Sequence, residues 1–198
     1  RLCEADLSRA EIADVHFEMA TIFDCKLERS SFARVVLDRS SMLRCTARGA
    51  HFDGVKIKSS VVGNADWSVA ASVRVHGNMA VFLEMCLAAI AFDDAELVRC
   101  QFNGSDLSDA TFRRARVTQC GFQGANLKRA VFDGACADGA VFVEADAREA
   151  SMKGTSLRQA LFVRADVSGA TFDGSDLYQA NLTDAVCEGA DFTVCDLT

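Results

Sequence analysis

Residues 92–127 read FDDAELVRCQFNGSDLSDATFRRARVTQCGFQGANL, and they decide the fold because a large apolar residue returns at every fifth position. The large apolar residues of this stretch are Phe92, Leu97, Phe102, Leu107, Phe112, Val117, Phe122 and Leu127. The register continues outward to Leu2 and to Leu197 without an insertion, and 38 of its 40 positions are apolar. Only Ser72 and Gly77 interrupt it. A period of five residues therefore organises the whole chain.

A second column, of small residues, lies two positions before the large ones. Of its 39 members, 37 are Ala, Ser, Cys, Thr or Val, and only Met85 and Ile90 are larger. Five residues advance an α-helix by about 140°, and a strand inverts its side chains every two residues, so neither element fits. A chain that bends after every five residues does fit, with one large and one small side chain turned inward. Four such sides close one coil, so the sequence predicts a single all-β solenoid domain over residues 1–198, with about ten coils stacked roughly 4.8 Å apart.

Four segments carry a resemblance to a known family. They are ADLSR at Ala5 to Arg9, ANLKR at Ala125 to Arg129, SDLYQ at Ser175 to Gln179 and ANLTD at Ala180 to Asp184. These segments resemble the A-(D/N)-L-x-x unit of pentapeptide-repeat proteins, and the resemblance extends over essentially the whole chain. It implies a right-handed quadrilateral parallel β-helix, in which the handedness comes from the resemblance alone.

The predicted coil also specifies which large residues stack. One column contains Ile12, Phe32, Phe52, Ser72, Phe92, Phe112, Phe132, Met152, Phe172 and Phe192. The opposite column contains Leu2, Ile22, Met42, Val62, Phe82, Phe102, Phe122, Phe142, Phe162 and Leu182. We therefore expect two opposed aromatic ladders, with Phe112 directly beside Phe132.

Residues 67–92 depart from the repeat. Ser72 and Gly77 replace large core residues there, while Met85 and Ile90 replace small ones. Outward positions in the same region form a predicted apolar belt, Val81, Leu83, Ala88, Ala89 and Ala91. An exposed apolar belt usually marks a contact surface, so we predict a protein-binding site there. We also expect a local irregularity, either a loop, a short helix or degenerate coils.

Charge is distributed unevenly in this chain of net charge −7. Seven acidic residues follow Arg164, with no basic residue among them: Asp166, Asp173, Asp176, Asp184, Glu188, Asp191 and Asp196. On the predicted coil these acids spread over every face, which favours a solvated end over a mimic of a phosphate backbone. A basic belt around one coil comprises Arg29, Arg34, Arg39 and Arg44, and a plain surface role is favoured over an anion site.

Composition and motifs narrow the function classes. Half of the residues are hydrophobic and proline is absent, which excludes a disordered chain, and the acidic balance argues against direct nucleic-acid binding. No apolar run is long enough to span a membrane. The sequence has no metal-ligand spacing, nucleophile motif or phosphate loop, so we expect no enzyme activity, no cofactor and no metal. Nine cysteines without a CxxC pair favour reduced core thiols and a cytoplasmic protein, although Cys25 with Cys45 and Cys100 with Cys120 lie close enough to be oxidised.

These observations predict a bacterial protein-interaction scaffold, part of a longer chain, that binds another protein or domain or pairs end to end with a second copy. The resemblance implies an alternative, because quinolone-resistance members of the family are acidic rods that bind DNA gyrase or topoisomerase IV by DNA mimicry. A further alternative is a repeat appendage of a secreted effector or secretion-system protein.

Overall fold

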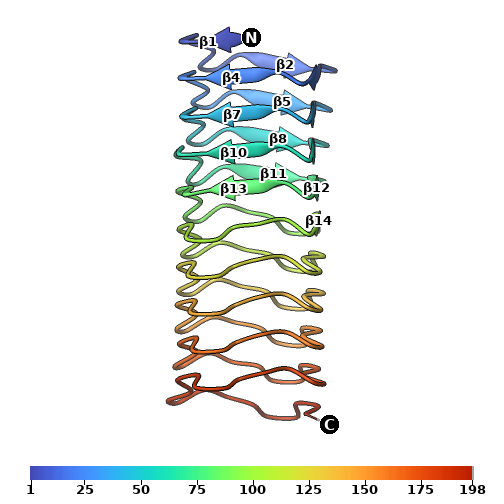
Figure 1. Cartoon of the computed structure of the whole chain (residues 1–198), viewed down its shortest axis with the longest axis vertical. Helices are drawn as coiled ribbons and strands as arrows, with labels where there is room; N and C mark the ends of the chain where they lie inside the picture. Colours follow the sequence, from blue (N-terminus) through green and yellow to red (C-terminus); the bar gives the residue numbers. More distant parts are fainter. Residues whose placement is uncertain (198) are drawn as a thin grey trace.

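The computed structural model describes residues 1–197, apart from the side chain of Val73, and shows a rod with one chain end at each tip (Figure 1). Residues 1–197 contain strands, bridges and turns and no helix, hence no helix that could cross a membrane. The chain winds around the rod axis, and each turn pairs in parallel with the turns before and after it.

Three faces of the rod carry parallel sheets in its N-terminal half. The first sheet has the order β1 (Leu2–Cys3), β4 (Thr21–Phe23), β7 (Ser41–Leu43), β10 (Val61–Gly63) and β13 (Val81–Leu83). The second has the order β11 (Ala71–Val73), β8 (His51–Asp53), β5 (Ser31–Ala33) and β2 (Glu11–Ala13). The third has the order β14 (Glu96–Val98), β12 (His76–Asn78), β9 (Lys56–Lys58), β6 (Val36–Asp38) and β3 (His16–Glu18). Isolated bridges such as Asp6 with Lys26 hold the fourth face.

The pairing register confirms the predicted coil. Ile22 pairs with both Leu2 and Met42, a step of twenty residues in each direction. The same step continues as isolated bridges to Asp176 with Asp196. Strands of two or three residues are confined to residues 2–98, and isolated bridges hold the coils from there to Asp196.

The two halves differ because their corners close differently. In the C-terminal half each corner carries a backbone hydrogen bond, such as that from Ala110 N–H to the Leu107 carbonyl at 3.1 Å. This bond shortens the extended segment to a single bridge residue. In the N-terminal half only the fourth face has such bonds up to residue 90, for example from Ala50 N–H to Ala47 O, so three-residue strands form on the other faces.

Each corner contains one residue with a left-handed backbone. These corner positions lie two residues after each large core residue, at residues 4, 9, 14 and onward to 194, and all have φ between 45° and 69°. A positive φ at the third residue of a hydrogen-bonded four-residue turn defines a type II turn, a position that favours glycine. Only ten corner positions are glycine, and even the β-branched Val69 and Val194 adopt the conformation.

The core consists of the two predicted aromatic ladders. The Phe112 and Phe132 rings stack with centroids 4.6 Å apart and planes within 6°. Phe132 also meets Phe122 and Phe142 of the opposite ladder edge-on, at 5.8 Å and 5.9 Å. All four rings are fully buried.

The prediction of an irregularity between residues 67 and 92 is wrong, because this region keeps the regular coil. Ser72 pairs with Phe52, and Gly77 pairs with Ile57 and Leu97, in register. Neighbouring side chains supply the missing volume: a Cβ at Gly77 would lie 2.7 Å from Cys100 Sγ and 2.8 Å from Leu97 Cδ2.

The other substitutions in this region are accommodated in the same way. Met85 and Ile90 are almost fully buried, so the enlarged small column compensates for the reduced large one. The Ser72 hydroxyl donates to the Ala91 carbonyl, and the indole N–H of Trp67 donates to the Cys45 carbonyl at 3.0 Å. A cavity of only about 10 Å³ remains among these residues. Conserved total volume, distributed differently between the two columns, preserves the coil.

Candidate binding surfaces

One face of the rod lacks charge along almost its whole length. It is the face of the first sheet, and its outward positions alternate with the Phe ladder that begins at Phe82. From residue 21 to residue 183 these positions are Thr21, Phe23, Ser41, Leu43, Val61, Gly63, Val81, Leu83, Gln101, Asn103, Gly121, Gln123, Val141, Val143, Leu161, Val163, Asn181 and Thr183. We call this set the uncharged face. Each of the other three faces carries Asp, Glu, Lys or Arg at several of the corresponding positions.

The uncharged face is apolar in two regions and close-packed. Leu83 is 43% exposed and Leu161 is 37% exposed, whereas most other members are half-buried against their neighbours along the rod. Gly63 fits between Leu43 and Leu83, since a Cβ there would lie 3.1 Å from Leu83 Cβ and 3.4 Å from Leu43 Cδ2. The result is a strip without charged side chains of its own, although the Arg44 guanidinium of a bordering corner lies over the Phe23 ring at 3.9 Å.

The structure places the predicted apolar belt on three different faces. Val81 and Leu83 flank the buried Phe82 in β13 and belong to the uncharged face. Ala88 and Ala89 lie at the corner after Leu87, on the next face, and Ala91 lies on the face of the second sheet. The belt therefore extends over about half of a coil and bends around two corners, so no single flat partner contacts all of it. Its role in binding stays a prediction.

The seven predicted acidic residues lie in six different columns around the rod, since only Asp176 and Asp196 share one. Arg158 contacts Asp176 at 2.8 Å and Arg148 approaches Asp166 at 3.7 Å, so two of the acids have basic neighbours. Asp173, Asp184, Glu188, Asp191 and Asp196 are exposed. The Asp191 carboxylate accepts hydrogen bonds from the hydroxyl and the N–H of Thr193, which lower its pKa. Several aspartates therefore hold their own corners rather than line one groove.

Arginines at the corner positions form a regular system of ion pairs. Most of them contact an acid one coil earlier, as in Arg34 with Asp14 at 2.6 Å and Arg44 with Asp24 at 2.7 Å. The others of this kind are Arg39 with Glu18, Arg74 with Asp53, Arg114 with Asp94, Arg129 with Asp109 and Arg164 with Glu144. Three of the four arginines of the predicted basic belt are thus paired with acids. The fourth, Arg29, has no ion pair with an acid in the described residues 1–197.

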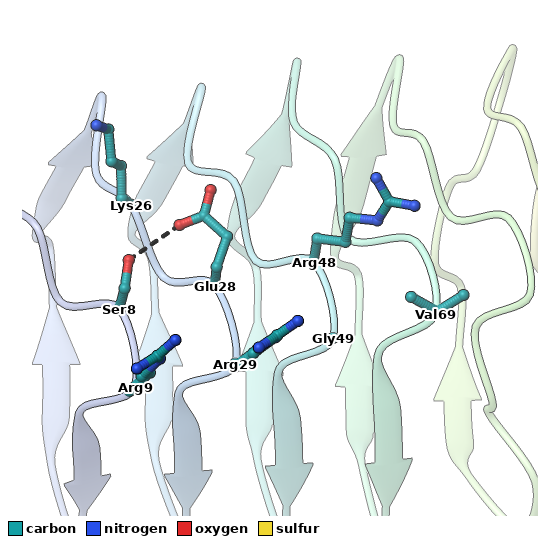
Figure 2. A pocket seen from close by; sticks show the side chains of 8 residues that line it. All are labelled: Ser8, Arg9, Lys26, Glu28, Arg29, Arg48, Gly49 and Val69. Atoms are coloured by element: carbon teal, nitrogen blue, oxygen red, sulfur yellow. Dashed lines mark hydrogen bonds between the residues drawn. The ribbon is translucent and has the colours of Figure 1, made fainter.

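Arg29 belongs to a separate basic cluster on the fourth face. A shallow hollow of about 760 Å³ lies there, lined by Ser8, Arg9, Lys26, Glu28, Arg29, Arg48, Gly49 and Val69 (Figure 2). Arg9 and Arg29 occupy the same corner on adjacent coils, and Figure 2 shows their side chains running parallel. No carboxylate of residues 1–197 lies within 4.0 Å of the charged nitrogens of the four basic residues.

Other reactive side chains are dispersed. Within residues 1–197 no three His, Cys, Asp or Glu side chains are grouped as a metal ion would need. His76 contacts Glu96 at 3.1 Å, and His16 and His51 lie on other coils. Cys25, Cys45, Cys100 and Cys120 are buried free thiols, and burial raises the pKa of Cys45 to about 11.

Sequence reasoning missed both the uncharged face and the basic cluster, although the signals were present. Assigning each outward residue to a face by its position in the twenty-residue coil reveals the missing charge between Thr21 and Thr183. The same assignment places Arg29 one coil above another arginine, whereas Arg34 and Arg44 follow aspartates. Counting charges along the chain mixes the four faces and hides both features.

Comparisons with known proteins agree with this geometry. A family model described as pentapeptide repeats matches residues 86–124, 125–162 and 160–198, together more than half of the chain. No curated protein matches the sequence. One similar solved structure is HetL of the cyanobacterium Nostoc sp. strain PCC 7120, a pentapeptide repeat protein involved in heterocyst differentiation regulation. It is 19% identical with a TM-score of 0.65, and the alignment covers 97% of this chain and 89% of HetL. QnrB1, a plasmid-mediated fluoroquinolone resistance protein, is 15% identical with a TM-score of 0.69, and 86% of this chain and 92% of QnrB1 are covered. At these identities the likeness concerns the fold.

Proposed function

Because the chain belongs to the pentapeptide-repeat family, whose rod offers flat faces for contact, we propose that it is a non-enzymatic scaffold that binds a partner protein through the uncharged face. The single observation that carries this proposal is the absence of Asp, Glu, Lys and Arg from the outward positions directly before and after each large core residue of this face, from Thr21 to Thr183. On this side of the rod charged residues occur only at corner positions, such as Asp24, Arg44 and Glu84, although one residue in four of the chain is charged.

Physical chemistry favours contact on this face over the others. Each charged face requires the partner to desolvate and pair its ions, which costs free energy unless the geometry is well matched. Exposed aliphatic side chains such as Leu83 and Leu161 contribute about 25 cal/mol of favourable binding free energy for each Å² of apolar surface that a partner removes from water. We therefore expect a partner with a flat, uncharged, largely apolar surface.

Affinity capture with two matched double variants tests the proposal. Leu83→Asp with Leu161→Asp places charges on the uncharged face, whereas Val131→Asp with Val186→Asp places them on other faces. Partners retained by the wild type, identified by mass spectrometry, are expected to disappear with the first variant and to persist with the second. Equal recovery with both variants, each checked for its β-sheet circular dichroism spectrum, contradicts the proposal.

A second candidate function is the binding of DNA gyrase or topoisomerase IV. The net charge of −7, the absence of basic residues after Arg164 and the fold shared with QnrB1 support it. In this function the acidic C-terminal coils replace the DNA duplex in the enzyme.

A supercoiling assay with purified gyrase, with and without a fluoroquinolone, tests this second function. Binding predicts inhibition or protection at micromolar protein. The effect is expected to weaken in the triple variant Asp184→Asn, Glu188→Gln, Asp191→Asn, and to persist in Leu83→Asp with Leu161→Asp. An unchanged supercoiling rate with the wild type rejects the function.

A further inference from the structure

The basic cluster on the fourth face is an exception to the charge pairing of the rod. At the corners of Arg34, Arg44, Arg114, Arg129 and Arg164 the arginine follows an acid one coil earlier, and Arg39 and Arg74 reach acids next to that position. Arg99 donates to the Gln119 side chain, whereas Arg29 follows Arg9. Coils stack about 4.8 Å apart, so the two guanidinium groups are like-charged neighbours. Lys26 and Arg48 add two more positive charges to the same hollow. Like charges held this close are unfavourable unless an anion compensates them.

The carboxylate within the cluster is engaged elsewhere. Glu28 accepts a hydrogen bond from the Thr46 hydroxyl at 2.6 Å and another from the Ser8 hydroxyl at 3.1 Å. These bonds, that from Thr46 foremost, hold the pKa of Glu28 below its ordinary value. Glu28 therefore stays ionised and leaves a net of three positive charges among the five ionised side chains that line the hollow.

Two further aspartates border the cluster and offset part of its charge, although no ion pair joins either of them to a basic residue of the cluster. Hydrogen bonds from Ser8 are the main cause of the lowered pKa of Asp6, and Lys26 contributes less. The pKa of Asp66 is raised by burial and lowered more strongly by hydrogen bonds from Ser68 and by the charge of Arg48. Both aspartates thus use a carboxylate oxygen to hold their own turn.

The shape of the hollow depends on Gly49. It occupies the corner position between those of Arg29 and Val69, and its lack of a side chain leaves a gap between them. A Cβ at residue 49 would lie 3.7 Å from Arg29 Cγ. The cations that border the gap come from three successive coils, a span of roughly 10 Å at the parallel-strand spacing.

From this geometry we propose that the hollow binds an anion with two or more phosphoryl groups. Three guanidinium groups and one ammonium group line the hollow from three coils, which suits tetrahedral phosphoryl groups that accept hydrogen bonds in several directions. A single carboxylate presents its oxygens in one plane and carries one charge, too little for this cluster. A free polyphosphate and a doubly phosphorylated protein segment share the required chemistry.

Titration calorimetry with sodium tripolyphosphate tests the proposal on the whole chain. Saturable one-to-one binding is expected for the wild type, with affinity reduced about tenfold by Arg29→Gln because a charge-assisted hydrogen bond is lost. Arg44→Gln is the matched control: it removes an arginine from an equivalent but acid-paired corner and is expected to leave the affinity unchanged. Glu28→Gln removes the one negative charge from the hollow and is expected to tighten binding.

Two further titrations separate the sources of the anion. A doubly phosphorylated peptide with adjacent phosphoserines that binds more tightly than tripolyphosphate assigns the hollow to a protein ligand, and the reverse order assigns it to a free polyphosphate. Inorganic phosphate is expected to bind far more weakly than either. The proposal is overturned if none of the three binds at millimolar concentration, or if Arg29→Gln and Arg44→Gln weaken tripolyphosphate binding equally.

Discussion

Replacing Phe132 by alanine is expected to destabilise the rod more than any exposed substitution. The ring is fully buried, stacks on Phe112 at 4.6 Å and meets Phe122 and Phe142 edge-on. Removing a buried Phe costs about 3–5 kcal/mol, and each aromatic pair adds about 0.5–1.5 kcal/mol beyond its buried area. Because adjacent coils confine the cavity, we expect a loss of about 4–5 kcal/mol in the free energy of unfolding.

Urea unfolding followed by circular dichroism measures this loss, with Phe192→Ala as the control. Phe192 is only half-buried and stacks on one ring, Phe172, at 4.8 Å, so its truncation is expected to cost less than half as much. Phe132→Leu keeps most of the volume and is expected to fall between the two. A Phe132→Ala variant no less stable than Phe192→Ala would show that the ladders do not hold the coils together.

Three other predictions concern backbone strain, thiol ionisation and surface ion pairs. Val69→Gly removes a β-branched residue from a corner with φ 52° and is expected to raise the free energy of unfolding by up to about 1 kcal/mol. Val131→Gly, at an extended position, is expected to lower it. The reverse order of urea midpoints refutes the strain argument. Burial raises the pKa of Cys45 to about 11, above that of an unfolded thiol, so the contribution of this thiol to stability is complete below pH 9 and is lost as the pH rises toward 11. The melting temperature of the wild type is therefore expected to fall over this range more steeply than that of Cys45→Ala. An equally steep fall in the variant contradicts the assignment. Hydrogen bonds from Arg44 lower the pKa of Asp24, so this pair stabilises the fold above the ordinary Asp pKa of 3.8 and loses its effect as the pH falls further. Arg44→Gln is therefore expected to be least destabilising at pH 2. An equal loss of stability at pH 2 and pH 7 argues against the pairing.

The sequence predicts the coil, its register and both aromatic ladders because these depend on a repeated choice between large and small side chains. Every fifth residue is apolar, and the pairing of Phe112 with Phe132 follows directly from the period. The predicted irregularity near Gly77 fails because composition was judged position by position, whereas packing depends on the summed volume of Gly77, Leu97 and Cys100 in space.

The corners and the surfaces were less predictable. Arg, Asp, Glu, Gln and even Val69 adopt a left-handed backbone because hydrogen bonds between adjacent coils impose it, so residue identity does not reveal the corner. The change from three-residue strands to hydrogen-bonded turns after residue 98 likewise has no marker in the period of five. Surface features such as the pairing of Arg44 and the isolation of Arg29 depend on residues twenty positions away.

Site-specific photo-crosslinking tests the proposed scaffold function most directly. A photoreactive amino acid at position 161 lies on the uncharged face, and the same probe at position 186 lies on a charged face, where Val186 is 50% exposed. We predict that irradiation in cells attaches one recurrent partner protein to the probe at position 161, and that this adduct is absent from position 186. Adducts of equal yield at both positions, or a partner attached only at position 186, would contradict the assignment of the binding surface.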